Sequence, residues 1–512
     1  MAKALMVQGT SSHAGKSIIV AALCRIFSNK GVRVAPFKAQ NMSLNSFVTV
    51  SGEEVGRSQA FQSFAARVPL TSNMNPILLK PKGDMTSQIV FHGKPFRDIS
   101  AKDYWRDFAS TIGFEGVKDS FQKLSREYDI VVIEGAGSPA EVNLYDFDIA
   151  NMKIAELADA PVLLVSDIDR GGAFASIIGT MNLLKPEHRV KVRGFILNKF
   201  RGDVKLLEPG LETVKNMTGT PVIGVLPYIH GLSLPDEDSV SLEDTKAETT
   251  RPIKIAVIRF PRISNFTDFE SLQTHPMVNL VFAASKDDLL NADMVILPGT
   301  KNTIKDLEWL RNLGMSSVIQ DLASNGIPIV GICGGYQMLG KTILDEKGIE
   351  SGSTKTVNGL RLLDIHTSFE TYDKVTELVS ARVLGSGPFV EKSQNQELSG
   401  YEIHMGKTVL GPNARPLLRV FRGQESTISF FDGAIDEKGL IFGSYLHGIF
   451  DKPPLRESVI AYLAARKGIA ARPRRTLVEE EWESSLERIV EAVERSLDMT
   501  LIFDLVGMKI RQ

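Results

Sequence analysis

Two short segments of the 512-residue chain combine residue types that could do chemistry. The first is Gly9-Thr10-Ser11-Ser12-His13-Ala14-Gly15-Lys16-Ser17, which follows an apolar run and opens a helix-like segment. In such a loop, backbone N–H groups hold phosphate oxygens, a lysine reaches the β- and γ-phosphates, and a serine hydroxyl binds Mg²⁺. Five residues separate the glycines, where the usual pattern has four. We expect ATP to bind here, through Gly9, Thr10, Gly15, Lys16 and Ser17; the alternative is a plain glycine-rich turn.

A carboxylate further along the chain supports a nucleotide site. The apolar run Ile130–Ile133 ends at Glu134-Gly135-Ala136-Gly137. Ligands of open α/β sheets bind beyond the carboxyl ends of the strands, where an acid can hold Mg²⁺ directly or through water. We therefore expect Ser17 and Glu134 to bind Mg²⁺. The competing interpretation makes Glu134 a helix cap.

The second segment places a cysteine between glycines. The apolar run Ile327–Val330 leads into Gly331-Ile332-Cys333-Gly334-Gly335, and an amphipathic stretch follows. The glycines permit a tight strand-to-helix turn that exposes a nucleophile, and the helix N-terminus favours its thiolate. The other cysteine, Cys24, lies mid-helix without such glycines and is predicted to be a buried, inert residue.

A thiol nucleophile needs a base, and the chain has eight histidines. His447 follows a strand-like run and precedes a glycine, which suits a base at a strand end. His404, in Gly400-Tyr401-Glu402-Ile403-His404, is the alternative.

The elements that must position these residues alternate between strand and helix. Short apolar runs occur near residues 5–7, 32–34, 130–133, 162–165, 195–197 and 222–225, with helix-length segments such as Lys16–Asn29, Ile149–Ala158 and Ala173–Leu184 between them. The alternation restarts at Lys254 after the acidic stretch Ser233–Arg251, and beyond Pro454 the pattern is helical, with a Trp482-to-Leu497 apolar stripe. We predict two doubly wound α/β domains and a helical tail. The expected boundaries are 1–232, a linker at 233–251, 252–452, and the tail at 453–512.

Composition narrows the functional class. The 59 Lys and Arg residues nearly balance the 61 Asp and Glu, so no bulk positive charge favours nucleic acid. Two cysteines exclude a disulfide scaffold and a cysteine-rich zinc site. No apolar run reaches the length of a membrane span, and the N-terminus lacks a secretory pattern. We expect a cytoplasmic enzyme that acts on small molecules, without a membrane or nucleic-acid partner; its oligomeric state is not predicted.

The motifs resemble two enzyme families. The widened phosphate loop with Glu134 resembles the dethiobiotin synthetase group, whose members transfer the γ-phosphoryl group of ATP to a carboxylate or carbamate. The cysteine segment with a later histidine resembles class I glutamine amidotransferases. That resemblance implies Cys333 as nucleophile and His447 as general acid/base, with an oxyanion hole from the N–H groups of Gly299 and Gly334. Many members carry an acid two residues after the histidine, whereas this chain has Ile449. The orienting third residue is therefore missing or supplied from elsewhere in the chain, and we expect a Cys–His dyad.

Longer strings resemble the cobyric acid synthase family across both halves, up to about Phe450. They are Phe37–Asn45, Asp146–Met152, Ala158–Gly172, Pro261–Phe269, Leu297–Thr303 and Gly400–Gly406. The resemblance implies amidation of the b, d, e and g side-chain carboxylates of adenosylcobyrinic acid a,c-diamide, with ATP and glutamine, in cobalamin biosynthesis. One departure is His13, where an acid is more usual.

A substrate with several carboxylates needs cations and amides at its pocket. Five residues in the resembling strings are hypotheses for binding it or for placing Mg²⁺: Lys38, Asn41, Asp146, Asp169 and Arg170. Structural ion pairs and caps are the alternative for each.

Three other functions compete with this prediction. Cobyrinic acid a,c-diamide synthase has the same two-domain organisation and amidates two carboxylates. The Lys38–Asn41 and Asp167–Gly172 strings favour the cobyric acid synthase family over it. A partitioning-type ATPase switch would carry an extra lysine early in the loop, and Thr10–Ala14 has none. A binding module with an inactive glutaminase is the third.

Overall fold

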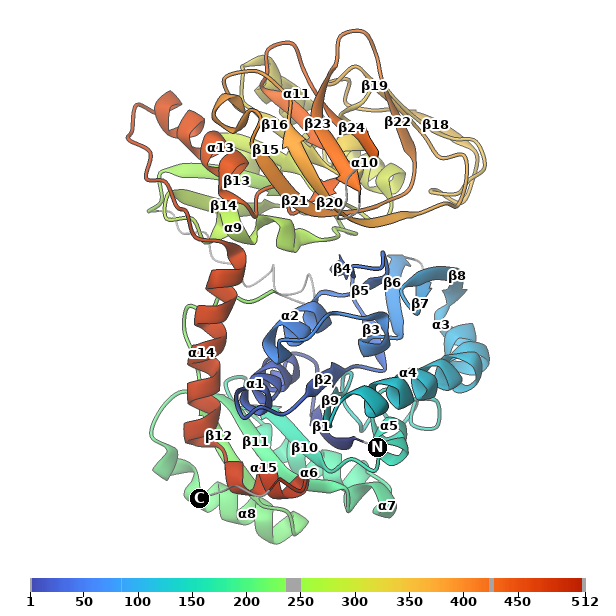
Figure 1. Ribbon diagram of the computed structural model, residues 1–512, viewed down its shortest axis with the longest axis vertical. Helices are drawn as coiled ribbons and strands as arrows, with labels where there is room; N and C mark the ends of the chain where they lie inside the picture. The colour runs from blue at the N-terminus through green and yellow to red at the C-terminus, as the bar shows by residue number, and fades with distance from the viewer. Residues whose placement is uncertain (1, 84, 236–249, 423–427, 509–512) are drawn as a thin grey trace.

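The computed structural model describes residues 2–83, 85–235, 250–422 and 428–508 (Figure 1). Most of the predicted linker, residues 236–249, lies outside the described residues. Two α/β bodies lie one above the other in Figure 1, and the long helix α14 (Val478–Ser496) runs alongside the lower body. The prediction of two α/β units with a helical tail is confirmed.

The lower body contains a six-stranded sheet in which every neighbouring pair is parallel. Its central strands are apolar and buried on both faces, as expected of a parallel sheet covered by helices, whereas the edge strand Val222–Pro227 is partly exposed. The order across the sheet is β12 (Val222–Pro227), β11 (Val192–Phe200), β10 (Val162–Asp167), β1 (Lys3–Gly9), β9 (Ile130–Glu134) and β2 (Val34–Phe37).

Predicted helices of this body agree closely with the observed ones. Helix α1 covers Lys16–Asn29, as predicted, and α6 covers Ala173–Leu183. Helix α5 begins at Met152, three residues later than expected, because the Asp148 carboxylate accepts the Ala150 N–H and holds a turn there. The second strand begins at Val34, so Val32 precedes it.

An unpredicted excursion follows β2 and points toward the upper body (Figure 1). Strands β3 (Gln40–Met42), β6 (Ile77–Gly83), β7 (Thr86–Phe91) and β8 (Lys94–Ser100) form a small sheet, and β4 (Ser46–Val48) pairs with β5 (Glu54–Gly56). Helix α2 (Arg57–Ala66) packs on α1. Helix α4 (Phe114–Glu127) leads back to β9. The excursion brings the lower body into contact with the upper one.

The upper body contains a ten-stranded sheet of two kinds. Five strands are parallel, as in a doubly wound domain: β14 (Val278–Ala283), β13 (Ile253–Ile258), β15 (Met294–Leu297), β16 (Ile329–Ile332) and β25 (Ile441–Ser444). The other half is antiparallel: β24 (Ile428–Ile435), β23 (Arg415–Arg422), β20 (Val375–Val383), β21 (Glu397–His404) and β26 (Leu446–His447). A four-stranded sheet flanks it: β18 (Lys355–Asn358), β17 (Thr342–Asp345), β19 (Ile365–Ser368) and β22 (Lys407–Leu410).

The tail belongs to both bodies. Helix α13 (Pro453–Arg466) buries Ile460 and Leu463 in the core of the upper body. The predicted stripe of α14 then packs on α1, with Trp482 edge-on to Phe61 at 5.6 Å. Helix α15 (Met499–Leu505) completes the same core. In the portion of the chain that the structure describes, no helix has the length and apolarity needed to cross a bilayer.

Candidate active sites

The predicted phosphate loop joins β1 to α1 at the carboxyl edge of the parallel sheet. Gly15 adopts φ 102°, and a side chain there would lie 2.0 Å from the Asn198 amide nitrogen, so glycine is required. Asn198 in turn donates to the Ala14 carbonyl at 2.9 Å. The loop is therefore held from the end of β11, which nothing in the local sequence indicated.

The polar side chains of the loop converge on Glu134. Ser17 Oγ donates to Glu134 Oε1 at 2.8 Å, and Lys38 Nζ lies 2.9 Å from the same oxygen. Gln62 Nε2 donates to Oε2 at 2.5 Å. Lys16 Nζ donates to the carbonyls of Ser11 and Gly137, which places it over the loop. The structure thus brings Ser17 and Glu134 together, adds Gln62 to them, and places Lys16 in the same loop.

Of the five residues proposed to bind substrate, only Lys38 reaches this cluster. Asn41 is buried and donates to Gln59 at 3.0 Å. Asp146 pairs with Lys185 at 3.1 Å on the surface, and Asp169 pairs with Arg201 at 2.8 Å. Arg170 is exposed. Their role in substrate binding stays a prediction.

Cys333 lies at the turn between β16 and α12 (Gly334–Leu339) with the strained backbone angles φ 51° and ψ −111°. The turn is tight because a side chain at Gly335 would lie 1.9 Å from the Leu297 carbonyl oxygen of β15. Cys333 is 8% exposed, and its Sγ lies 3.6 Å from the Ile403 carbonyl oxygen. This arrangement is the predicted nucleophile elbow.

His447 has an acidic partner that the sequence analysis missed. Its Nδ1 lies 2.7 Å from Asp268 Oδ2, and the Gly448 N–H donates to the other oxygen at 3.0 Å. Tyr401 stacks on the imidazole with ring centroids 5.2 Å apart. Of the two possibilities left open by Ile449, the geometry favours a third residue supplied from elsewhere: Asp268, in the 3-10 helix Phe266–Phe269 that follows β13. Asp268 lies in the Pro261–Phe269 string, which was noted for its resemblance alone.

The electrostatics of this trio favour a charged imidazole. Burial alone would lower the pKa of His447, but the Asp268 carboxylate and the Cys333 thiol outweigh it and raise that pKa to about 10. His447 therefore carries a proton at neutral pH, as a group that protonates a departing amine requires.

His404, the alternative base, has a different environment. Burial lowers its pKa to about 3, and its ring stacks on Tyr445 with centroids 3.7 Å apart. Its Nδ1 is buried without a hydrogen bond to any described residue. Because no carboxylate orients this ring among the described residues, the geometry favours His447.

The two glycines expected to form an oxyanion hole lie beside the cysteine. Gly334 is the first residue of α12, where backbone N–H groups have no intrahelical partner. A side chain on Gly334 would touch Thr300, and one on Gly299 would lie 3.3 Å from His447 Cε1. Both backbones therefore approach the reacting centre closely, which is the arrangement that donors to a tetrahedral oxyanion need.

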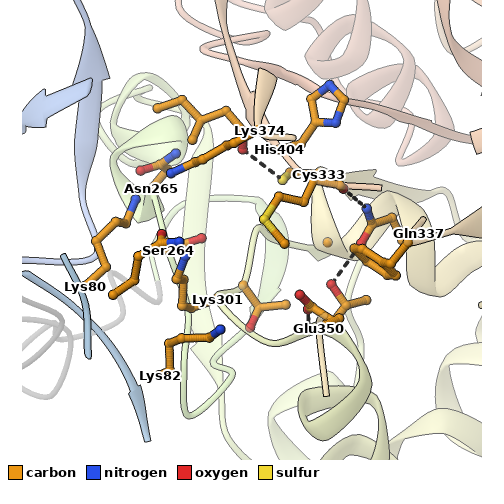
Figure 2. Close-up of a pocket in the computed structure, with 17 residues that line it drawn as sticks. Lys80, Lys82, Ser264, Asn265, Lys301, Cys333, Gln337, Glu350, Lys374 and His404 are labelled. Carbon is orange, nitrogen blue, oxygen red and sulfur yellow. Dashed lines mark hydrogen bonds between the residues drawn. The ribbon is translucent and has the colours of Figure 1, made fainter. Parts of the chain in front are cut away.

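Cys333 faces a pocket between the two bodies (Figure 2). The small sheet of the lower body contributes Lys80, Lys82 and Gln88 to its wall. The upper body contributes most of the remaining wall: Ser264, Asn265, Thr300, Lys301, Thr303, Gly334, Gln337, Glu350, Phe369, Lys374, Ile403, His404 and Met405. The candidate nucleophile is therefore enclosed by both bodies.

The seam beside this pocket is polar and buried. Glu54 lies 2.5 Å from Lys80 Nζ and also pairs with Lys374 of the upper body. Ser46 N–H donates to Asn265 Oδ1 at 3.0 Å, and Asn265 Nδ2 lies 3.4 Å from His447 Nε2. The lower body is thus two hydrogen-bonding steps from the imidazole.

Comparison with known proteins covers nearly the whole chain. The family model of the CobQ/CobB/MinD/ParA nucleotide binding domain matches residues 5–241, and that of the CobB/CobQ-like glutamine amidotransferase domain matches residues 254–455. The chain is 48% identical to the cobyric acid synthase of Moorella thermoacetica over 511 residues, 99% of this chain and 98% of that protein. It is also 48% identical to the cobyric acid synthase of Pelotomaculum thermopropionicum and to the probable cobyric acid synthase of Methanothermobacter thermautotrophicus; each alignment covers 99% of this chain, and 97% and 99% of those proteins. The chain therefore belongs to the cobyric acid synthase family.

Proposed function

We propose that the chain is a glutamine-hydrolysing amide ligase that uses ATP to make adenosylcobyric acid from adenosylcobyrinic acid a,c-diamide. The carboxylates amidated are those at positions b, d, e and g of the corrinoid. The observation that carries the proposal is the pairing of a phosphate loop with a Cys–His–Asp site in one chain of this family.

The proposed upper-body chemistry uses residues that the geometry groups. The Cys333 thiolate attacks the side-chain amide carbon of glutamine, while the N–H groups of Gly334 and Gly299 stabilise the oxyanion. His447 gives its proton to the departing ammonia, and Asp268 holds the ring in place. Water then cleaves the thioester and releases glutamate.

The lower body consumes that ammonia. Lys16 and the loop N–H groups hold the phosphates of ATP, and the γ-phosphoryl group passes to a substrate carboxylate. Ammonia attacks the acyl phosphate, so that an amide forms and phosphate leaves. The enclosed position of Cys333 between the bodies supports ammonia transfer without exposure to solvent.

Mg²⁺ is the expected companion of ATP, and the donor set fits it. The Ser17 hydroxyl and the Glu134 carboxylate are hard oxygen donors 2.8 Å apart. Mg²⁺ usually keeps several waters and is bound through one or two protein oxygens together with substrate phosphates. Once bound, the ion would neutralise phosphate charge.

The test is a product analysis with a nucleophile variant. The wild-type chain, with ATP, Mg²⁺, glutamine and the a,c-diamide, should yield a corrinoid whose mass shows an amide at each of the b, d, e and g positions. Cys333→Ala should lose this activity with glutamine and keep it with ammonium. The proposal would be contradicted if the wild type formed the amides only with ammonium and not with glutamine. It would also be contradicted if Cys333→Ala still used glutamine.

The same analysis distinguishes the alternatives. A cobyrinic acid a,c-diamide synthase would amidate cobyrinic acid and leave the a,c-diamide unchanged. An ATPase switch would hydrolyse ATP without forming any amide.

A further inference from the structure

Of the described residues that line the pocket facing Cys333, Lys301 and Glu350 are a lysine and a carboxylate that form no ion pair with another described side chain. Lys301 follows β15 directly, and its Nζ donates to the Gln88 side-chain oxygen at 2.6 Å. Within the part of the chain that the structure describes, no carboxylate forms an ion pair with Lys301. Burial and the nearby ammonium groups of Lys374 and Lys80 lower the pKa of Lys301 well below its usual range. An anion bound beside Lys301 would favour its charged form, so this position suits an anion-binding group.

Glu350 is the opposite case. It is 8% exposed, and its Oε1 accepts the Thr303 N–H at 2.5 Å. No lysine or arginine among the described residues lies at ion-pair distance from it. Burial raises the pKa of Glu350, while the Lys301 ammonium acts to lower it. Among the described residues, Lys301 and Glu350 line the same pocket but do not form an ion pair with each other.

Figure 2 shows Lys301 and Glu350 on the same side of Cys333 in the pocket. Free glutamine carries an amide at one end and, at the other, a carboxylate and an ammonium group on one carbon. An amide placed at Cys333 leaves those two charges to be matched elsewhere in the pocket. A carboxylate and an ammonium side chain in the same wall match them with opposite signs.

We propose that Lys301 binds the α-carboxylate of glutamine and that Glu350 binds its α-ammonium group. The assignment rests on the proposed function, because it takes Cys333 as the group that attacks the amide. It makes the pocket selective for the free amino acid over amides that lack either charge.

The lower body takes part in this selectivity through Gln88 of β7. Gln88 is 1% exposed; its side-chain oxygen accepts from Lys301 Nζ, and its Nε2 donates to the Tyr372 hydroxyl at 2.9 Å. Gln88 is therefore a positioning residue that fixes the Lys301 ammonium from the other body. The glutamine site is complete only when the two bodies are in contact.

A comparison of substrates tests the assignment of Lys301. Glutamine hydrolysis is measured beside hydrolysis of 4-aminobutanamide, which is glutamine without its carboxylate. Lys301→Met should lower kcat/KM for glutamine by about 10–100-fold, mainly through KM, because one charge-assisted contact is lost. The same variant should hydrolyse 4-aminobutanamide as well as the wild type does, within about twofold. Equal losses on both substrates would overturn the assignment.

Glu350 has the complementary test. Glu350→Gln should lower kcat/KM for glutamine by a factor similar to that of Lys301→Met. It should change kcat/KM for glutaramate, which lacks the ammonium group, only slightly. Gln88→Leu should raise KM for glutamine less than Lys301→Met does and leave KM for 4-aminobutanamide unchanged. Lys347→Met removes an exposed lysine near Glu350 and should match the wild type with every substrate.

The outcomes separate this inference from the proposed function. If Cys333→Ala still hydrolyses glutamine, the nucleophile and the proposed function fail together. Suppose instead that Cys333→Ala is inactive, but that Lys301→Met loses as much activity on 4-aminobutanamide as on glutamine, and Glu350→Gln as much on glutaramate as on glutamine. In that case only the assignment of Lys301 and Glu350 fails.

Discussion

The phosphate loop and the cysteine site occupy equivalent places in the two bodies, yet they are built differently. Each lies where a parallel strand passes into a helix, at the carboxyl edge of a sheet. Most of the predicted ATP-binding groups come from nine consecutive residues, Gly9–Ser17. The cysteine site draws Asp268, Gly299, Cys333 and His447 from four distant segments.

The two sites therefore depend on different parts of the fold. The phosphate loop carries its own backbone donors and needs few distant residues, such as Asn198, which holds the Ala14 carbonyl. The cysteine site needs the sheet to be complete, since Asp268 and His447 are 179 residues apart in sequence. It also needs the lower body, because Asn265 and Lys301 are both held by residues of that body.

The largest expected effect is at Asp268. Asp268→Asn keeps the shape but removes the charge that orients His447, so glutamine-dependent turnover should fall by about 10⁴-fold. Ammonium-dependent amidation, measured on the same preparation, should persist. If both fell together, Asp268 would have a structural role and the two sites would not be separable.

The same substitution has a pH dependence with a definite sign. His447 has its pKa raised from 6.5 to about 10 in the folded chain, so the stabilisation it brings is fully present below pH 6.5 and is lost as the pH rises through 10. The difference in unfolding free energy between the wild type and Asp268→Asn should shrink over that interval. Denaturant titrations at several pH values measure it, and a difference that grows with pH would contradict the pairing.

The substitution Lys16→Met tests the role of the phosphate loop in amidation. Loss of a preorganised charge at the phosphates should lower amidation by about 10²–10³-fold with glutamine or ammonium as the nitrogen source. Release of glutamate without ATP should be unaffected, because Lys16 lies in the phosphate loop and donates to the Ser11 and Gly137 carbonyls of its own body. A parallel fall of glutamate release would show that the phosphate loop controls the cysteine site.

The smallest expected effect is on stability, at the Glu54–Lys80 and Glu54–Lys374 ion pairs of the interface between the bodies. Glu54→Gln leaves the ammonium groups of Lys80 and Lys374 buried without their carboxylate, which should cost about 3 kcal/mol of unfolding free energy. The two lysines hold the pKa of Glu54 below its usual range despite burial, so this stabilisation is present above pH 4.5 and is lost as the pH falls further.

The matched control for that substitution is Glu127→Gln, at an exposed position at the end of α4. It should change the unfolding free energy by less than about 0.5 kcal/mol. Equal stability of Glu54→Gln and Glu127→Gln would show that the ion pairs at the seam contribute nothing net.

The features that could be predicted from the sequence are those that depend on local pattern. Apolar runs of strand length, the Gly9–Ser17 loop and the glycines around Cys333 each dictate backbone conformation over a few residues, so their places could be predicted. The α14 stripe at helical spacing likewise predicted a packed helix, but not that it would lie against α1 of the other body.

Contacts between residues that are far apart in the sequence could be identified only from the tertiary structure. The 3-10 helix Phe266–Phe269 brings Asp268 beside His447 of β26, although β13 and β26 lie near opposite ends of the sheet. Neither residue spacing nor hydropathy encodes that proximity. The alternation in residues 77–100 was a usable strand pattern that could have revealed the small sheet. Its contact with the cysteine pocket depends on packing between the two bodies, which is why Gln88 and Lys301 could be paired only in three dimensions.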